Sequence, residues 1–240
     1  GYMISKKVIS NIVSKYSLGN HIEKVDWVID DKKLNIKFIN DSKVLTGYVE
    51  YRDTIGLKNG SYSIFNTSQL IKCLNILDGD ILLEANSKLN MADTNYEVKF
   101  SFADPALIPD VPYIKEPDQA SVSFNLNDEF ITRFVKSKDA LSDLDIFTVE
   151  TREGFTGEEL VFTIGTNITN TIEFTVEAEI NESFGPVPFD SNILKEILKA
   201  NRDYHSGEVR IFKGGMIDLH MHCGGPLYTG YYLVRKQENN

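Results

Sequence analysis

The spacing of apolar residues predicts four helices along this chain. In residues 5–17 apolar side chains recur every three or four positions, as on one face of a helix. The same spacing recurs in 67–77, 127–140 and 190–202. The candidate N-cap residues are Asn66, Thr67 or Ser68 for the second helix and Asp190 for the fourth.

Between the helices the pattern changes to alternation of apolar and polar residues, which predicts half-buried β-strands. The predicted strands before the chain's midpoint span 33–39, 44–51, 80–85, 88–92 and 96–102. Those after it span 145–151, 159–163, 171–179, 208–212, 216–222 and 230–235. The two sets indicate two strand-rich regions.

A proline-rich segment separates these regions. Four of the seven prolines fall between Ala103 and Pro117, and proline cannot serve a central strand because it has no N–H to donate. We therefore expect an extended linker over 104–120. It would join an N-terminal domain, residues 3–103, to a C-terminal domain, residues 121–237.

The two regions repeat one plan. The apolar spacing of Val8–Val13 returns about 122 residues later in Phe130–Val135. With one gap allowed, Phe65–Lys72 is echoed by Phe189–Lys195. We interpret the chain as two copies of one α+β domain, each with two short helices and antiparallel sheets.

The composition is that of a folded protein, with 42% hydrophobic and 25% charged residues. We expect no membrane-spanning segment and no signal peptide, since no apolar run is long enough. Cys73 and Cys223 do not make a disulfide framework, which fits a reducing cytoplasm. The net charge of −10 argues against a protein that coats nucleic acid with its whole surface.

The basic residues gather on the predicted helices. These helices hold ten Lys or Arg against five Asp or Glu, a balance of +5, so the rest of the chain carries −15. On helical wheels the basic residues opposite the apolar faces are Lys7, Lys72, Arg133, Lys136, Lys195 and Lys199. One interpretation is an ordinary charged solvent face. The other is a basic helical surface that contacts the DNA backbone without reading its sequence.

The order and spacing of these elements resemble the DNA polymerase sliding clamps, and most of all the trimeric clamps of T-even-type bacteriophages. The resemblance rests on the repeated plan and on Phe102-Ala103-Asp104-Pro105, which enters the linker. It also rests on Pro188–Asp218, a helix followed by a hairpin, and on the terminal strand Tyr231–Val234.

This resemblance implies a processivity factor that acts in the cytoplasm of an infected bacterial host. Clamp domains would assemble into a ring, here a homotrimer of six domains. Duplex DNA would thread the hole against the six basic residues named above. The ring would tether the replicative polymerase and bind a clamp loader, without a cofactor.

The resemblance also implies two protein-binding sites. The subunit interface would pair an edge strand with Tyr96, Val98 and Phe100 against one with Ile172, Phe174 and Val176. Partner peptides would dock in an apolar pocket formed by Leu107, Ile108, Val111, Pro226, Tyr231 and Leu233. An alternative for the linker residues is that they simply pack onto their own domain.

Residues His220-Met221-His222-Cys223 have the residue types of a metal site but supply too few ligands. His220 and His222 share one face of a strand. A zinc site needs three or four ligands, and His205 is the only other histidine nearby. We therefore expect no metal.

Catalytic motifs are missing from the sequence: there is no P-loop, dinucleotide fingerprint or nucleophile elbow, which argues against an enzyme. Two alternatives to a clamp stay open. One is an acidic, β-rich viral structural or assembly protein with a duplicated domain. The other is a hydrolase that uses His220 and His222, which would require stoichiometric metal.

Overall fold

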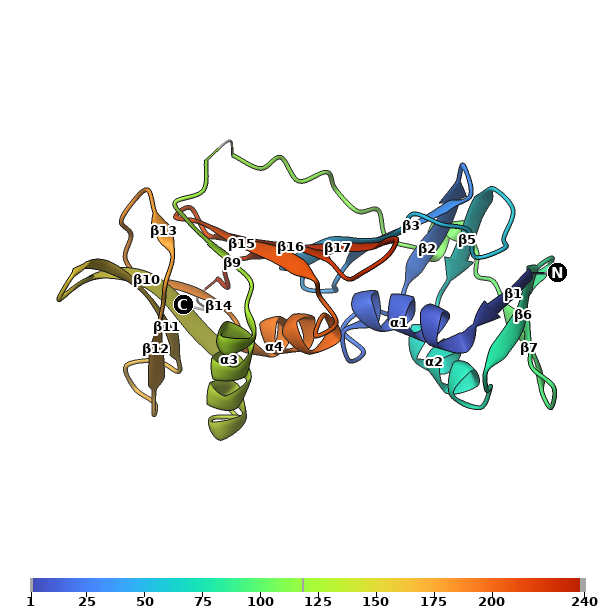
Figure 1. The fold of residues 1–240 in the computed structure, drawn as a ribbon, viewed down its shortest axis with the longest axis horizontal. Coiled ribbons are helices and arrows are strands. Elements are labelled where there is room, and N and C mark those ends of the chain that lie inside the picture. Colours follow the sequence, from blue (N-terminus) through green and yellow to red (C-terminus); the bar gives the residue numbers. More distant parts are fainter. Residues whose placement is uncertain (1, 118, 238–240) are drawn as a thin grey trace. The chain divides into compact units, whose positions relative to one another are not determined.

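The computed structural model describes residues 2–117 and 119–237 of the 240-residue chain. It contains two compact units. The first runs to Pro112 and includes Cys223–Thr229, whereas the second comprises Tyr113–His222 and the residues from Gly230 onward. In each unit two α-helices pack side by side against antiparallel sheet (Figure 1). The fold is α+β with a duplicated plan, as the sequence predicts.

The first unit holds helices α1 (Lys6–Ser17) and α2 (Thr67–Asn75). Its strands are β1 (Tyr2–Ser5), β2 (Val25–Asp30), β3 (Lys33–Ile39), β4 (Leu45–Tyr51), β5 (Gly60–Ile64), β6 (Asp80–Ala85), β7 (Lys88–Ala92) and β8 (Glu97–Ser101). They pair antiparallel in the orders β1-β6-β7-β8 and β4-β3-β2-β5.

The helices of the first unit are joined by a buried hydrogen-bond chain. Tyr16 of α1 and Thr67 of α2 bring their hydroxyls within 2.9 Å of each other. The Thr67 hydroxyl also donates to the backbone carbonyl of Glu23, so the Tyr16 hydroxyl is the donor between the two. Asn66 caps α2 by accepting from the N–H of Gln69, which confirms one of the three predicted N-caps.

The second unit holds helices α3 (Asp128–Ala140) and α4 (Ser191–Ala200). Its strands are β9 (Val122–Asn125), β10 (Ile146–Gly154), β11 (Gly157–Ile164), β12 (Ile172–Val176), β13 (Glu179–Ile180), β14 (Val187–Asp190), β15 (Ser206–Phe212) and β16 (Met216–His222), with most of β17 (Leu227–Val234). They pair in the orders β12-β11-β10-β14 and β13-β9-β15-β16-β17. Asp190 caps α4 as predicted, because its carboxylate accepts from the N–H of Ile193.

Aromatic side chains fill the core of the second unit. Phe130 of α3 lies edge-on to Phe124 and Phe162, with ring centroids 5.0 and 5.1 Å away. Phe162 in turn stacks on Phe174 of β12 at 5.6 Å. Such pairs add to the free energy of burial, so α3 is held over β11 and β12 by ring contacts.

The start of the linker is not wholly extended. Asp104 caps a short 3-10 helix, η1 (Pro105–Leu107), by accepting from the N–H of Ala106. The N–H of Ala103 donates to the carbonyl of Ser63 on β5, which ties this end of the linker to the first unit. Among the described residues, no helix is long and apolar enough to cross a membrane.

Candidate functional site

In the first unit, the buried face of each helix fixes where its lysines point. Ile9 and Ile12 of α1 are 1% exposed, and Lys7 lies exposed on the same helix. Leu70 of α2 is fully buried, while Lys72 is exposed. Both predicted DNA-facing lysines of this unit are therefore on helix surfaces that solvent reaches.

In the second unit, the helices expose most of the basic residues that the pattern singled out. Arg133 and Lys136 of α3 and Lys199 of α4 are exposed. Lys195 of α4 is half-buried, with 24% of its side chain exposed. Contact with DNA remains a prediction for all of them.

Two other helix lysines are buried. Lys15 is 0% exposed and Lys138 is 2% exposed. The ammonium of Lys138 donates to the backbone carbonyls of Ser142 (2.7 Å) and Leu144 (2.9 Å), which follow the end of α3. This lysine therefore satisfies carbonyls at the helix C-terminus and adds nothing to the exposed basic surface.

Acidic neighbours pair with two of the six candidate cations. Arg133 forms an ion pair with Glu129 one turn earlier and donates to the carbonyl of Thr175 on β12 at 3.3 Å. Lys195 forms an ion pair with Asp139 of α3. The hydrogen bond from Lys195 lowers the pKa of Asp139, so that carboxylate is charged at neutral pH. DNA phosphates would have to compete with these carboxylates.

A cavity of about 460 Å³ lies in the first unit under the linker. One wall is formed by Ile108, Pro109 and Val111. The other wall is formed by β2 and β3 and includes Val28 and Leu34. The structure thus brings two of the predicted pocket residues, Ile108 and Val111, to one hollow.

The other predicted pocket residues lie elsewhere. Leu107 is 55% exposed at the end of η1, and Pro226 is half-buried with its carbonyl bonded to the N–H of Arg52. Tyr231 and Leu233 are fully buried. Tyr231 and Leu233 therefore belong to the core and not to an open pocket surface, because the terminal strand turns both side chains inward.

The strands proposed for the subunit interface are both edge strands. β8 ends the order β1-β6-β7-β8, and β12 ends the order β12-β11-β10-β14. Tyr96 lies just before β8 and is exposed, whereas Val98 and Phe100 turn inward. On β12 the three interface candidates Ile172, Phe174 and Val176 are half-buried, and Glu173 and Thr175 are exposed between them.

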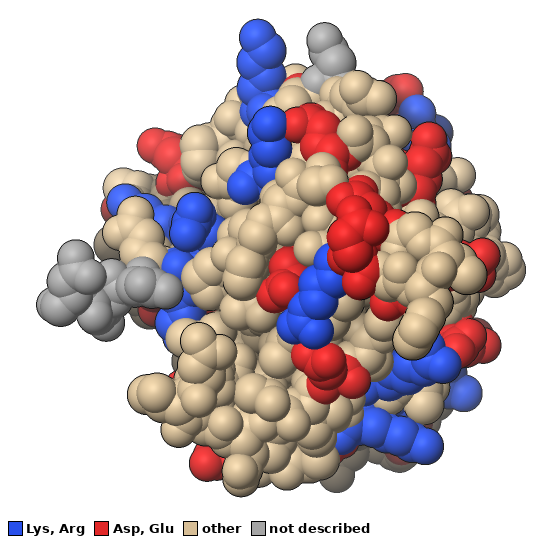
Figure 2. All heavy atoms as spheres, turned by 90° about the vertical axis from the view of Figure 1, so that its left-hand side faces the viewer, with Lys and Arg blue, Asp and Glu red and all other residues tan. Residues whose placement is uncertain are grey.

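A hollow of about 800 Å³ lies beside the β12 edge. Its lining includes Arg133 of α3, Arg152 and Phe155 of the β10–β11 hairpin, and Glu173 of β12. Arg152 pairs with Glu173 at 2.9 Å. The side of the molecule where β10, β11 and β12 lie shows Lys and Arg scattered among Asp and Glu, with no field of one sign (Figure 2). This edge would suit a partner of mixed charge better than a polyanion.

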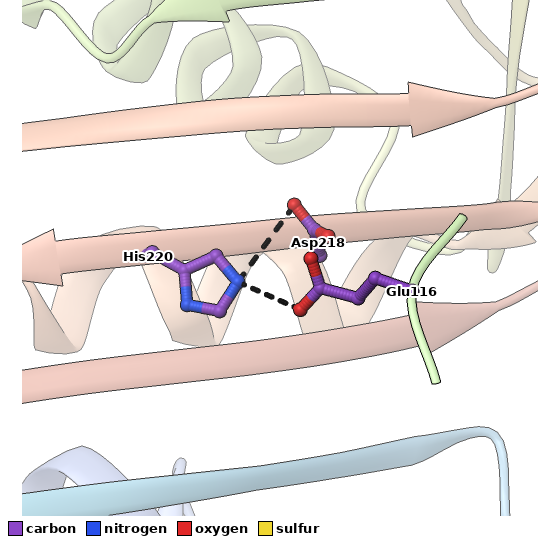
Figure 3. Close-up of side chains that lie close together, drawn as sticks. All are labelled: Glu116, Asp218 and His220. Atoms are coloured by element: carbon purple, nitrogen blue, oxygen red, sulfur yellow. Dashed lines mark hydrogen bonds and ion pairs between the residues drawn. The ribbon is translucent and has the colours of Figure 1, made fainter. Parts of the chain in front are cut away.

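A cluster that the sequence did not reveal lies on the sheet of the second unit. Glu116 of the linker reaches Asp218 and His220, which are neighbours on one face of β16 (Figure 3). The His220 Nε2 atom lies 3.3 Å from Glu116 Oε1 and 3.9 Å from Asp218 Oδ1. Arg210 of β15 binds the other oxygen of Glu116 at 2.9 Å.

The two carboxyls of this cluster differ in acidity. Burial, reinforced by the adjacent Glu116, raises the pKa of Asp218 to about 8. Burial would also raise the pKa of Glu116, but hydrogen bonds from Asp218 and Tyr232 and the charges nearby outweigh it and lower that pKa. Asp218 therefore carries a proton at neutral pH and shares it with Glu116.

No family model and no curated protein matches this chain. Solved structures do match this chain. A crystal structure of Proliferating Cellular Nuclear Antigen (PCNA) from Entamoeba histolytica superposes with a TM-score of 0.73 over 97% of this chain and 96% of that one, at 15% identity. The chain has the fold of a sliding clamp.

A second sliding-clamp structure gives the same result. The PCNA of A. fulgidus, solved with the C-terminal region of FEN-1 bound, matches with a TM-score of 0.73 at 14% identity. The match covers 99% of this chain and 98% of that one. At identities this low, the two superpositions establish the sliding-clamp fold alone. They give no support to a phage subtype in particular.

Proposed function

We propose that this chain is a non-enzymatic DNA polymerase processivity factor: a ring that encircles duplex DNA and tethers the replicative polymerase. The observation that carries the proposal is the sliding-clamp fold with exposed basic side chains on the helices of both units. A tethered polymerase stays at high effective concentration on its template, so dissociation no longer limits synthesis.

The charge distribution supports contact with DNA that ignores sequence. The exposed candidates are Lys7, Lys72, Arg133, Lys136 and Lys199, with Lys195 half-buried. Cations on flexible stems contact phosphates without reading bases, and the contacts weaken as salt rises. The chain as a whole carries −10, so its remaining surface repels DNA.

The ring itself would be a homotrimer of the phage type, with β8 of one chain beside β12 of the next. Two edge strands supply the unpaired backbone groups that such pairing needs. A head-to-tail contact of this kind closes into a ring when the rotation permits. The bacterial cytoplasm during phage infection is the setting that we propose for this ring.

Partner proteins, the polymerase and clamp loader among them, would dock a peptide tail in the cavity beside Ile108 and Val111. The A. fulgidus PCNA structure holds the C-terminal region of another protein, which supports this kind of docking. Pro226 and Leu107 would lie outside the cavity lining. Tyr231 and Leu233 would support the terminal strand from within, since both are buried.

The deciding experiment measures how DNA topology affects retention. We expect the protein to stay on a nicked circular DNA and to leave soon after a restriction enzyme makes the circle linear. Solution mass over a wide concentration range should be three times the 27.2 kDa chain. Equal retention on circular and linear DNA would refute encirclement, and a strict monomer would refute the trimeric ring.

A further inference from the structure

Three side chains in the second unit have the spacing of metal ligands. Donor atoms of Glu116, Asp218 and His220 all lie within 4.8 Å of one another. In a tetrahedral zinc site with bonds of about 2.0–2.1 Å, neighbouring ligand atoms are about 3.3–3.4 Å apart. The His220–Glu116 distance is 3.3 Å and the His220–Asp218 distance is 3.9 Å. Small side-chain movements would thus close the three atoms around an ion.

Asp218 gives a second, independent reason to expect a cation. Its side chain is 0% exposed. No donor reaches either carboxylate oxygen in good hydrogen-bond geometry. The one exception is the hydrogen bond that a protonated Asp218 would itself donate to Glu116. Without an ion, Asp218 keeps the proton that it shares with Glu116. A metal ion would replace that proton, because a buried carboxylate is stable in its ionised form only when it is paired or binds a metal. The close-up shows this group directed at His220 and Glu116 (Figure 3).

We propose that Glu116, Asp218 and His220 form a site for a divalent transition-metal ion of the zinc class. One imidazole and two carboxylates are a donor set that suits Zn²⁺ better than Mg²⁺ or Ca²⁺, which prefer oxygen ligands alone. Three protein ligands leave the fourth position to water.

The charged neighbours fit an outer shell around such an ion. Arg210 holds Glu116 Oε2 and leaves Oε1 facing His220, which orients the ligand. The Arg210 Nε atom lies 3.5 Å from Asp218 Oδ1, so one cation is already near. Glu208 adds a further negative charge to this environment. With both cluster carboxylates ionised, the surroundings stay net negative and attract a divalent cation.

A metal ion at this site would anchor the linker. Glu116 belongs to the segment between η1 and β9, whereas Asp218 and His220 lie on β16. An ion shared by the three would hold this segment on the sheet of the second unit and stabilise that unit by mass action. This role does not depend on DNA or on the proposed clamp function.

The first test is zinc binding by protein stripped with a chelator. We expect one Zn²⁺ per chain in competition with a chromophoric chelator, and no displacement by millimolar Mg²⁺. Glu116→Gln and His220→Gln should each weaken binding more than about tenfold. The matched control is His222→Gln, which should not, because the His222 ring lies beside His205 instead. Absence of binding, or binding lost only in His222→Gln, would overturn the site.

A second readout follows the linker directly. Lys115 is exposed and precedes Glu116, so trypsin can cut between them. Zinc should slow this cut in the wild type and in His222→Gln, and should leave the rate unchanged in Glu116→Gln and His220→Gln. Both ligand variants change side chains that are 25–33% exposed and should stay folded, which circular dichroism would check. Equal rates of trypsin cleavage with and without zinc in the wild type would contradict this anchoring of the linker.

Discussion

Lys195 on α4 forms an ion pair with Asp139 on α3, so one of the cations proposed to face DNA already has an acidic partner. The same Asp139 carboxylate is also stabilised by Lys199 and Lys138 nearby. Asp139 should therefore weaken DNA binding in two ways, since it occupies Lys195 and adds a negative charge beside the exposed Lys199. Removing that charge tests whether this helix face meets DNA.

Asp139→Asn should lengthen retention on nicked circular DNA. Lys195 would be released to contact phosphate, and one repulsive charge would be removed. The measurement is the dissociation rate between 50 and 200 mM salt, roughly the range over which such contacts weaken. Asp41→Asn, in an exposed turn after β3, is the control and should change nothing. Faster dissociation of Asp139→Asn would show that the α3–α4 surface does not face DNA.

Neutralising the exposed helix lysines should weaken DNA binding together. Changing Lys7, Lys72, Lys136 and Lys199 to Ala removes four cations, and the slope of log affinity against log salt should fall by about 0.9 for each phosphate that is no longer neutralised. The thermal midpoint should stay near the wild-type value because all four are exposed.

The matched control changes four exposed lysines outside the helices: Lys32, Lys43, Lys58 and Lys88. The control removes the same net charge, so it separates a local interaction with DNA from a general change in charge. An equal loss of affinity in both variants would count against a basic helical surface.

Charge reversal at the β8 edge should weaken the trimer. Lys99 is exposed on β8, while Glu173 is exposed on β12. If the two edges pair, Lys99→Glu places like charges at each of three interfaces, which we expect to raise the dissociation constant at least about tenfold. The control is Lys88→Glu on β7, one strand in from the edge. Sedimentation over a range of concentrations would reveal the shift, and an unchanged trimer would place the interface elsewhere.

Much of the fold could be read from periodicity because most elements are long enough to show it. The bounds of β3, β6, β7 and β16 agree with the predicted ranges, and the four helices agree within a few residues. The prediction also missed β2 and β5, which have six and five residues. Other missed strands are shorter: β1 and β9 have only four residues each. So short a run shows no period of its own, and it becomes a strand only when it pairs with β6 or β15.

The candidate site was less accessible from sequence, since burial and tertiary neighbours decide it. A helical wheel identifies Lys72 as exposed, but it cannot show that Lys138 turns back to carbonyls beyond the helix end. Alternation on the last strand does not reveal which of its sides is covered, so it cannot show that Tyr231, a predicted pocket residue, is buried. Glu116 lies about 100 residues from Asp218 and His220, and no spacing rule joins them.

The buried hydroxyl of Tyr16 should contribute to the stability of the first unit. It donates to Thr67, and the Trp27 indole N–H donates to it at 3.4 Å. Tyr16→Phe breaks both bonds and should lower the free energy of unfolding by about 1–3 kcal/mol at pH 7. Tyr62→Phe, which loses only an exposed bond to the carbonyl of Lys58, is the control and should cost less.

The pH dependence of this effect has a definite sign. Burial raises the pKa of Tyr16 to about 12, whereas the pKa of a tyrosine in the unfolded chain is about 10. The unfolded state therefore loses its proton first. The contribution of the Tyr16 hydroxyl to the free energy of unfolding is fully present below about pH 10. It is lost as the pH rises towards about 12. Urea unfolding gives the free energy of unfolding at pH 7 and at pH 11. Between these two pH values it should fall less for Tyr16→Phe than for wild type. Equal losses would mean that the Tyr16 hydroxyl is not buried as described.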